Sequence, residues 1–152
     1  MGIRNSNPWL LAGGMLSGLA ATLHLGIIVG GPPWYRFFGA GETMARMAEA
    51  GHWYPTALTL LIATGLSIWA AYAFSGAGLI RRLPLLRTGL VAISLIYLAR
   101  GLVIVPAMVL NPQGPSGLTA FTWWSSLIVL VYGLTYAVGT KLAWPRLTRP
   151  RT

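Results

Sequence analysis

TGLVAISLIYLARGLVIVPAMVL, residues 88–110, is a run long enough to cross a bilayer, and Arg100 is its one charged residue. A helix of about 20 apolar residues spans the hydrocarbon layer. The guanidinium of Arg100 keeps its proton at any useful pH, and at membrane depth it costs about 3 kcal/mol or more unless it meets a partner, a carbonyl or water. The stretch therefore predicts a membrane-spanning helix and a polar partner for Arg100.

Three further stretches have the length and composition of membrane spans: Trp9–Gly31, Tyr54–Phe74 and Leu118–Thr140. The chain is 55% hydrophobic and 9% charged, against roughly 25% charged for a soluble domain. We therefore expect an all-α integral membrane four-helix bundle, with residues 1–152 forming a single transmembrane domain. Pro145 and Pro150 predict that the last helix does not continue far into the tail. The chain has no cysteine, which excludes disulfides and thiolate chemistry.

The net charge of +9 is distributed by loop. With four spans, one side carries most of the basic residues: Arg4, Arg81, Arg82, Arg87, Lys141, Arg146, Arg149 and Arg151. The positive-inside rule then places both termini in the cytoplasm. Because topology and contact with anionic headgroups account for these charges, membrane lipids are the expected partners and nucleic acid is not.

Depth along each helix follows from the rise of 1.5 Å per residue. Arg100 lies about 18 Å from the cytoplasmic end of its span and His24 about 22 Å from that of the first, so both are in the outer half of the bilayer. The fourth span places further polar and aromatic residues at the outer face, as does the start of the second: Trp123, Trp124, Ser125, Ser126, Tyr54, Pro55 and Thr56. This distribution predicts a polar pocket that opens outward.

The connection between the first two spans predicts a short amphipathic periplasmic helix from Glu42 to Ala50. The residues before it are punctuated by Pro32, Pro33, Gly39 and Gly41, and the sequence predicts no helix for them, although the connection is too long to be a passive loop. Glu42 and Glu49 are the only acidic residues in the chain. We expect one of them, preferably Glu42, to pair with Arg100, with Tyr97 one turn below and His24 across the bundle.

Other polar groups and small residues lead to further predictions about ligation and helix packing. His24 is expected to have a packing or hydrogen-bonding role, and haem ligation by His24 and His52 lacks a supporting motif. The two histidines and two glutamates show no paired ligand spacing, so no metal site is expected. Gly14 and Gly18 predict close helix contact, within the bundle or in a homo-oligomer. Pro106 is expected to loosen the third helix beyond Arg100.

Three stretches resemble those of small bacterial membrane proteins with four spans: PWYRFFGAGE at 33–42, GLIRRLPLLR at 78–87 and YLARG at 97–101. The resemblance covers most of the chain. It implies a multi-pass protein of the bacterial inner membrane, and it implies no particular activity, cofactor or ligand.

Two functions from different classes remain open, with binding expected ahead of catalysis. The first is binding of a small amphiphile or lipid headgroup in the outward-opening pocket. The second is a membrane-embedded enzyme acting on a lipid or quinone, with His24 and Glu42 as acid–base groups and Arg100 holding developing charge. An oligomeric channel or transport component is a further alternative. The residues expected to contact a ligand are Arg100, Glu42, His24, Tyr97, Arg36, Trp34, Trp123 and Trp124.

Overall fold

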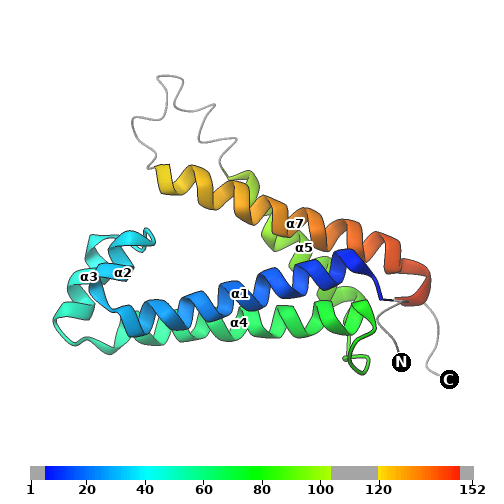
Figure 1. Ribbon diagram of the computed structural model, residues 1–152, viewed down its shortest axis with the longest axis horizontal. Helices are drawn as coiled ribbons and strands as arrows, with labels where there is room; N and C mark the ends of the chain where they lie inside the picture. The colour runs from blue at the N-terminus through cyan, green and yellow to red at the C-terminus, as the bar shows by residue number, and fades with distance from the viewer. Residues whose placement is uncertain (1–5, 104–119, 148–152) are drawn as a thin grey trace, which may run out of the picture. The chain divides into compact units, whose positions relative to one another are not determined.

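A computed structural model describes residues 6–103 and 120–147. These residues form helices and no strands, as the sequence predicts (Figure 1). In chain order the helices are α1 (Pro8–Gly30), α2 (Pro32–Phe37), α3 (Glu42–Glu49), α4 (Trp53–Ala77), α5 (Leu86–Leu102) and α7 (Ala120–Leu147). The expected spans at 9–31 and 54–74 correspond closely to α1 and α4, and the amphipathic helix expected at 42–50 corresponds to α3.

Three of these helices, α1, α4 and α7, are long and apolar enough to cross a membrane. They also leave large apolar side chains uncovered, among them Met15, Leu19, Val29 and Leu61. Soluble proteins rarely expose so much contiguous apolar surface, so the helices indicate a membrane protein. In the third expected span, α5 accounts for residues up to Leu102. Residues 104–110, Pro106 and the connection at 111–117 lie outside the described residues.

The chain divides into two compact units: unit 1 comprises Met1–Leu16 and Trp69–Thr152, and unit 2 comprises Ser17–Ile68. The boundaries fall inside α1 and α4, so each of these helices contributes to both units. The expectation of a single transmembrane domain stays a prediction.

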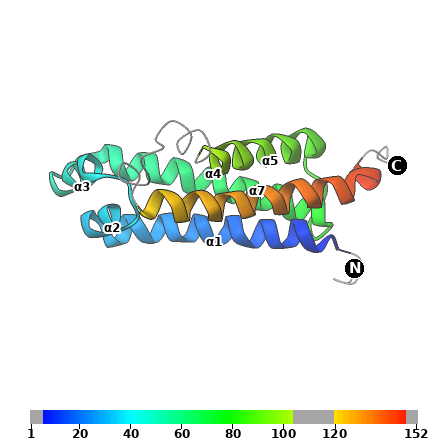
Figure 2. The ribbon, with the colours of Figure 1, turned by 90° about the horizontal axis from the view of Figure 1, so that it is seen from above.

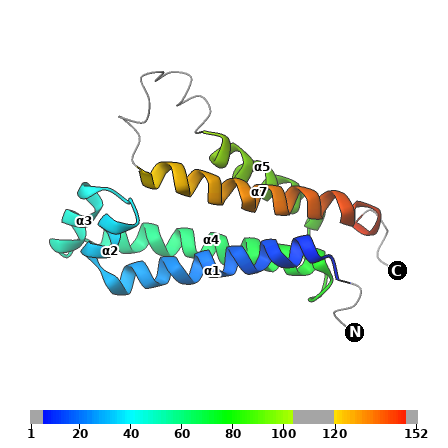
Figure 3. The same cartoon turned by 45° about the horizontal axis from the view of Figure 1, so that its top comes forward.

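In unit 1, α5 and α7 pack against each other along their lengths (Figure 3). A Cβ atom on Gly101 would lie 2.8 Å from the backbone N and Cα of Leu130, and one on Gly133 would lie 2.8 Å from Leu98. Since the numbers rise along one helix as they fall along the other, the two helices are antiparallel. The glycines let the backbones approach more closely than any side chain would allow.

The start of α1 packs in unit 1 against the end of α4 and against α7. Leu10 is fully buried, and its side chain packs directly on Gly76 of α4 and on Gly139 of α7. A Cβ atom on either glycine would clash with it. Gly14 receives the ring of Phe74 from α4 in the same way. The close helix contact predicted at Gly14 is therefore made within the chain, whereas an oligomer through Gly14 and Gly18 stays a prediction.

Four aromatic rings form the centre of unit 1. Tyr97 of α5 lies 4.8 Å from Trp69, 5.5 Å from Tyr132 and 5.4 Å from Tyr136, measured between ring centroids. The hydroxyl of Tyr136 donates to the Trp69 carbonyl at 3.0 Å. Edge-to-face contacts at these distances are favourable, and the buried hydroxyl is satisfied.

Unit 2 contains α2, a helix that the sequence did not predict. Its first residues are Pro32 and Pro33, and proline suits the first turn of a helix because its missing N–H would have no partner there. Gly31 precedes it with a φ of 64°, a conformation that glycine adopts without strain. α2 and α3 then pack on each other (Figure 2), around a core of Ile27, Tyr35 and Ala45.

The last helix extends beyond the expected span at 118–140. α7 continues past Thr140 and through Pro145 to Leu147. Pro145 lies in the final turn, where it removes only one intrahelical hydrogen bond, and the carbonyl of Leu147 accepts a hydrogen bond from Nη2 of Arg82. The side chain of Arg82 thus donates a hydrogen bond to a terminal carbonyl that has no partner within the helix.

Candidate functional site

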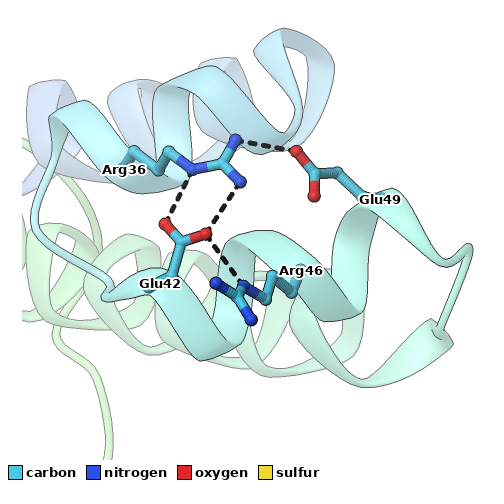
Figure 4. Close-up of polar contacts among 4 residues, drawn as sticks. All are labelled: Arg36, Glu42, Arg46 and Glu49. Atoms are coloured by element: carbon cyan, nitrogen blue, oxygen red, sulfur yellow. Dashed lines mark hydrogen bonds and ion pairs between the residues drawn. The ribbon is translucent and has the colours of Figure 1, made fainter.

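Arg36, on α2, holds both acidic residues of α3 (Figure 4). Its Nε and Nη2 donate to the two carboxylate oxygens of Glu42 at 2.8 and 3.1 Å, and its Nη1 lies 2.8 Å from Glu49 Oε1. Arg46, one turn after Glu42 on α3, donates to the same carboxylate at 3.1 Å. This bidentate contact suits the planar guanidinium and links α2 to α3. We call these four residues the ion-pair cluster.

The ion-pair cluster fixes the charge of Glu42. Hydrogen bonds from Arg36 and then Arg46 lower the pKa of the Glu42 carboxyl from its ordinary value of 4.5 to about 2, and the same contacts raise the pKa of Arg36. A carboxylate with so low a pKa is a weak base and is almost never protonated near neutral pH. The ion-pair cluster therefore weighs against the acid–base role considered for Glu42.

This arrangement makes the α2–α3 contact sensitive to acid. Because the pKa of Glu42 is lower in the folded protein, its contribution to stability is present above pH 4.5 and is lost as the pH falls toward 2. We expect Arg36→Gln to move the Glu42 titration, followed by NMR of the side-chain carboxyl, upward toward 4.5. Arg46→Gln is the matched control and should cause a smaller rise. Equal shifts in the two variants would contradict the leading role of Arg36.

Arg100 lies near the end of α5, and its Nη1 donates to Ser126 Oγ of α7 at 3.3 Å. The sequence placed both residues at the outer level, and the antiparallel packing of α5 on α7 brings them together. Ser126 is almost fully buried, whereas Arg100 is exposed at the surface of unit 1. Glu42 and Glu49 contact Arg36 within unit 2. The expected pairing of Arg100 with an acid stays a prediction.

The other expected ligand contacts occupy varied surroundings. His24 has Nδ1 at 2.7 Å from the Ala20 carbonyl; a carbonyl only accepts, so Nδ1 carries the proton. Trp34 covers Gly26 and Gly30 of α1, Trp124 is 67% exposed, and Tyr97 is buried among the rings described above. The indole Nε1 of Trp123 is buried and has no hydrogen-bond partner among the described residues.

A pocket of about 500 Å³ lies within unit 2, where α1 ends, α2 begins and α4 starts. Its apolar wall includes Ile28, Leu60 and Trp53, and its polar groups include Thr56 and His52. None of the eight residues expected to contact a ligand lines it. Among the residues that line the pocket, Thr56 was the one that the sequence had placed at the outer face, together with Tyr54 and Pro55.

Tyr35 also lines this pocket, and its hydroxyl is oriented by hydrogen bonding. The Thr59 hydroxyl donates to the Pro55 carbonyl at 2.7 Å and lies 3.2 Å from Tyr35 Oη. Since Thr59 has one hydroxyl proton, Tyr35 must be the donor to Thr59. The lone pairs of the Tyr35 oxygen then remain able to accept. Tyr35 was not among the residues expected to contact a ligand, because the sequence predicted no helix at 32–37 to place it at this pocket.

Within residues 6–103 and 120–147 no group of three or more His, Cys, Asp or Glu side chains is placed to hold a metal ion. The pocket offers hydroxyls, an imidazole and an apolar wall, which suit a molecule with a polar head and an apolar body. Comparison of the chain with models of protein families, with curated proteins and with solved structures finds no match.

Proposed function

We propose that the protein binds a small amphiphile or a lipid headgroup in the pocket of unit 2. The observation that carries the proposal is the pocket itself: polar groups from Tyr35, Thr56 and His52 lie beside an apolar wall formed by Ile28 and Leu60. Its volume of about 500 Å³ is within the roughly 300–1,000 Å³ of known small-molecule sites. A polar head would contact the hydroxyls while an apolar chain follows the helices.

The setting of this site is a bacterial inner membrane, crossed four times by a helix bundle with both termini in the cytoplasm. The basic loops support this orientation through the positive-inside rule. The antiparallel packing of α5 on α7 supports successive crossings. In this topology residues 31–53 are periplasmic, so the pocket opens outward. The ion-pair cluster then presents its charges to the same side.

Filling the pocket provides the test. Ala57 lines it, and Ala57→Phe would place a ring where the apolar part of a ligand should lie. Ala50→Phe adds the same ring at an exposed position that does not line the pocket. The protein would be purified in mild detergent, given a single-chain phosphocholine lipid, and studied by native mass spectrometry.

We expect the parent and Ala50→Phe to retain a bound amphiphile and Ala57→Phe to bind at least tenfold more weakly. A parent protein that neither keeps an amphiphile through purification nor binds the added lipid would contradict the proposal. Retention by Ala57→Phe at the parent level would place the ligand elsewhere.

A further inference from the structure

A second and larger cavity, of about 650 Å³, lies in unit 1. Four separate parts of the chain form it: Ser6 before α1, the turn after α4, the start of α5 at Leu86, and the end of α7. Three arginines line it, Arg81 and Arg82 from the turn and Arg146 from α7. We call it the arginine cavity. The proposed amphiphile pocket contains none of these residues.

The turn that carries two of these arginines is fixed by side chains of α4. Ser75 Oγ donates to the Arg81 carbonyl and accepts from the backbone N–H of Leu83, both at 3.0 Å. The Tyr72 hydroxyl donates to the Pro84 carbonyl at 3.1 Å. Since backbone on both sides of Arg82 is held in this way, the segment that carries Arg81 and Arg82 is ordered before any ligand arrives, which lowers the backbone entropy lost on binding.

The charged residues that line the arginine cavity are all basic. Both acidic residues of the chain, Glu42 and Glu49, belong to unit 2, and the sequence segments of unit 1 contain neither Asp nor Glu. Three positively charged side chains line one cavity, so an anion that enters it would be attracted by all three.

We propose that the arginine cavity binds a phosphate group. Guanidinium groups donate paired hydrogen bonds that match phosphate oxygens, and the Ser6 hydroxyl lines the same space. The apolar side chains of Leu79, Ile80 and Leu86 also line it, so a phosphate ester with an apolar substituent fits better than a fully hydrated anion. Such a phosphate could belong to a membrane lipid or to a soluble molecule.

The test uses the full chain in mild detergent and two phosphate probes, each with a control that lacks phosphate. Native mass spectrometry would compare phosphatidylglycerol with diacylglycerol, which has the same chains but no phosphate. Thermal unfolding would compare inorganic phosphate with chloride at equal ionic strength. The variants are Arg81→Gln and Arg146→Gln, which remove a lining guanidinium. Arg82 is left intact because it also satisfies the end of α7.

Arg87→Gln is the matched control. It removes the same charge from the same region, but Arg87 does not line the arginine cavity and instead lies 4.6 Å over the ring of Trp144. We expect phosphatidylglycerol to bind in preference to diacylglycerol, and Arg81→Gln and Arg146→Gln to weaken that binding roughly tenfold, the effect of one charge-assisted hydrogen bond. Arg87→Gln should bind like the parent.

The two measurements distinguish a phosphate carried by a lipid from soluble phosphate. Binding of phosphatidylglycerol without stabilisation by inorganic phosphate identifies a lipid site, whereas stabilisation by inorganic phosphate that Arg81→Gln abolishes identifies a site for soluble phosphate. If neither phosphate probe acts, or if Arg87→Gln weakens binding as much as Arg81→Gln, the proposal is overturned. Ala57→Phe should retain phosphate binding, so this test and that of the amphiphile pocket can fail separately.

Discussion

Replacing Gly101 with alanine is expected to lower the free energy of unfolding by about 2 kcal/mol. The new Cβ would lie 2.8 Å from the backbone N and Cα of Leu130. Backbone atoms cannot turn aside as the end of a side chain can, so α5 and α7 would have to separate along a contact that also includes Gly133 and Leu98. Overpacking of this kind costs more than the helix propensity that alanine gains over glycine.

Gly65→Ala is the matched control for this prediction. Gly65 is also inside a long apolar helix, α4, and no described atom lies within 4 Å of a Cβ built at that position. There the propensity gain should act alone and raise stability by about 0.5–1 kcal/mol. Thermal unfolding of both variants in the same detergent would measure the difference. If Gly101→Ala unfolds at or above the temperature of the parent, the close approach of α5 and α7 is wrong.

The sequence predicts the long helices well because their signal is composition over some 20 residues, which no single contact overrides. It also locates α3, where Glu42, Arg46 and Glu49 recur at helical spacing. α2 was missed because two prolines and two glycines indicate a loop when they are read singly. Proline at the first two positions of α2 instead starts a helix.

The candidate site was harder to predict because it depends on which side chains meet. Arg36 and Arg100 are both arginines at the outer level, and charge alone does not say which of them holds Glu42. In the structure α2 and α3 pack together, so Arg36 reaches both carboxylates locally. Arg100 contacts Ser126, which lies opposite it in the antiparallel pair. Both contacts depend on how neighbouring helices pack, and the spacing of residues in the sequence does not encode that packing.

The second prediction concerns Asn7, which links two helices of unit 1. Asn7 precedes α1, and its Oδ1 accepts hydrogen bonds from the N–H groups of Trp9 and Leu10 at 3.1 and 3.2 Å. Its Nδ2 donates to the Gly139 carbonyl of α7 at 2.7 Å. Asn7 therefore caps the first turn of α1 and joins that helix to α7, while its side chain is buried.

Asn7→Ala is expected to destabilise the protein by about 2–3 kcal/mol, because it removes the cap and leaves the buried backbone N–H of Leu10 unsatisfied. Asn7→Asp separates the two roles: the carboxylate still accepts from the first turn of α1 but cannot donate to Gly139. Its stability, measured by thermal unfolding in the same detergent, should therefore lie below that of the parent. A loss equal to that of Asn7→Ala would assign the whole effect to the contact with α7, whereas no loss in either variant would show that α1 does not depend on Asn7.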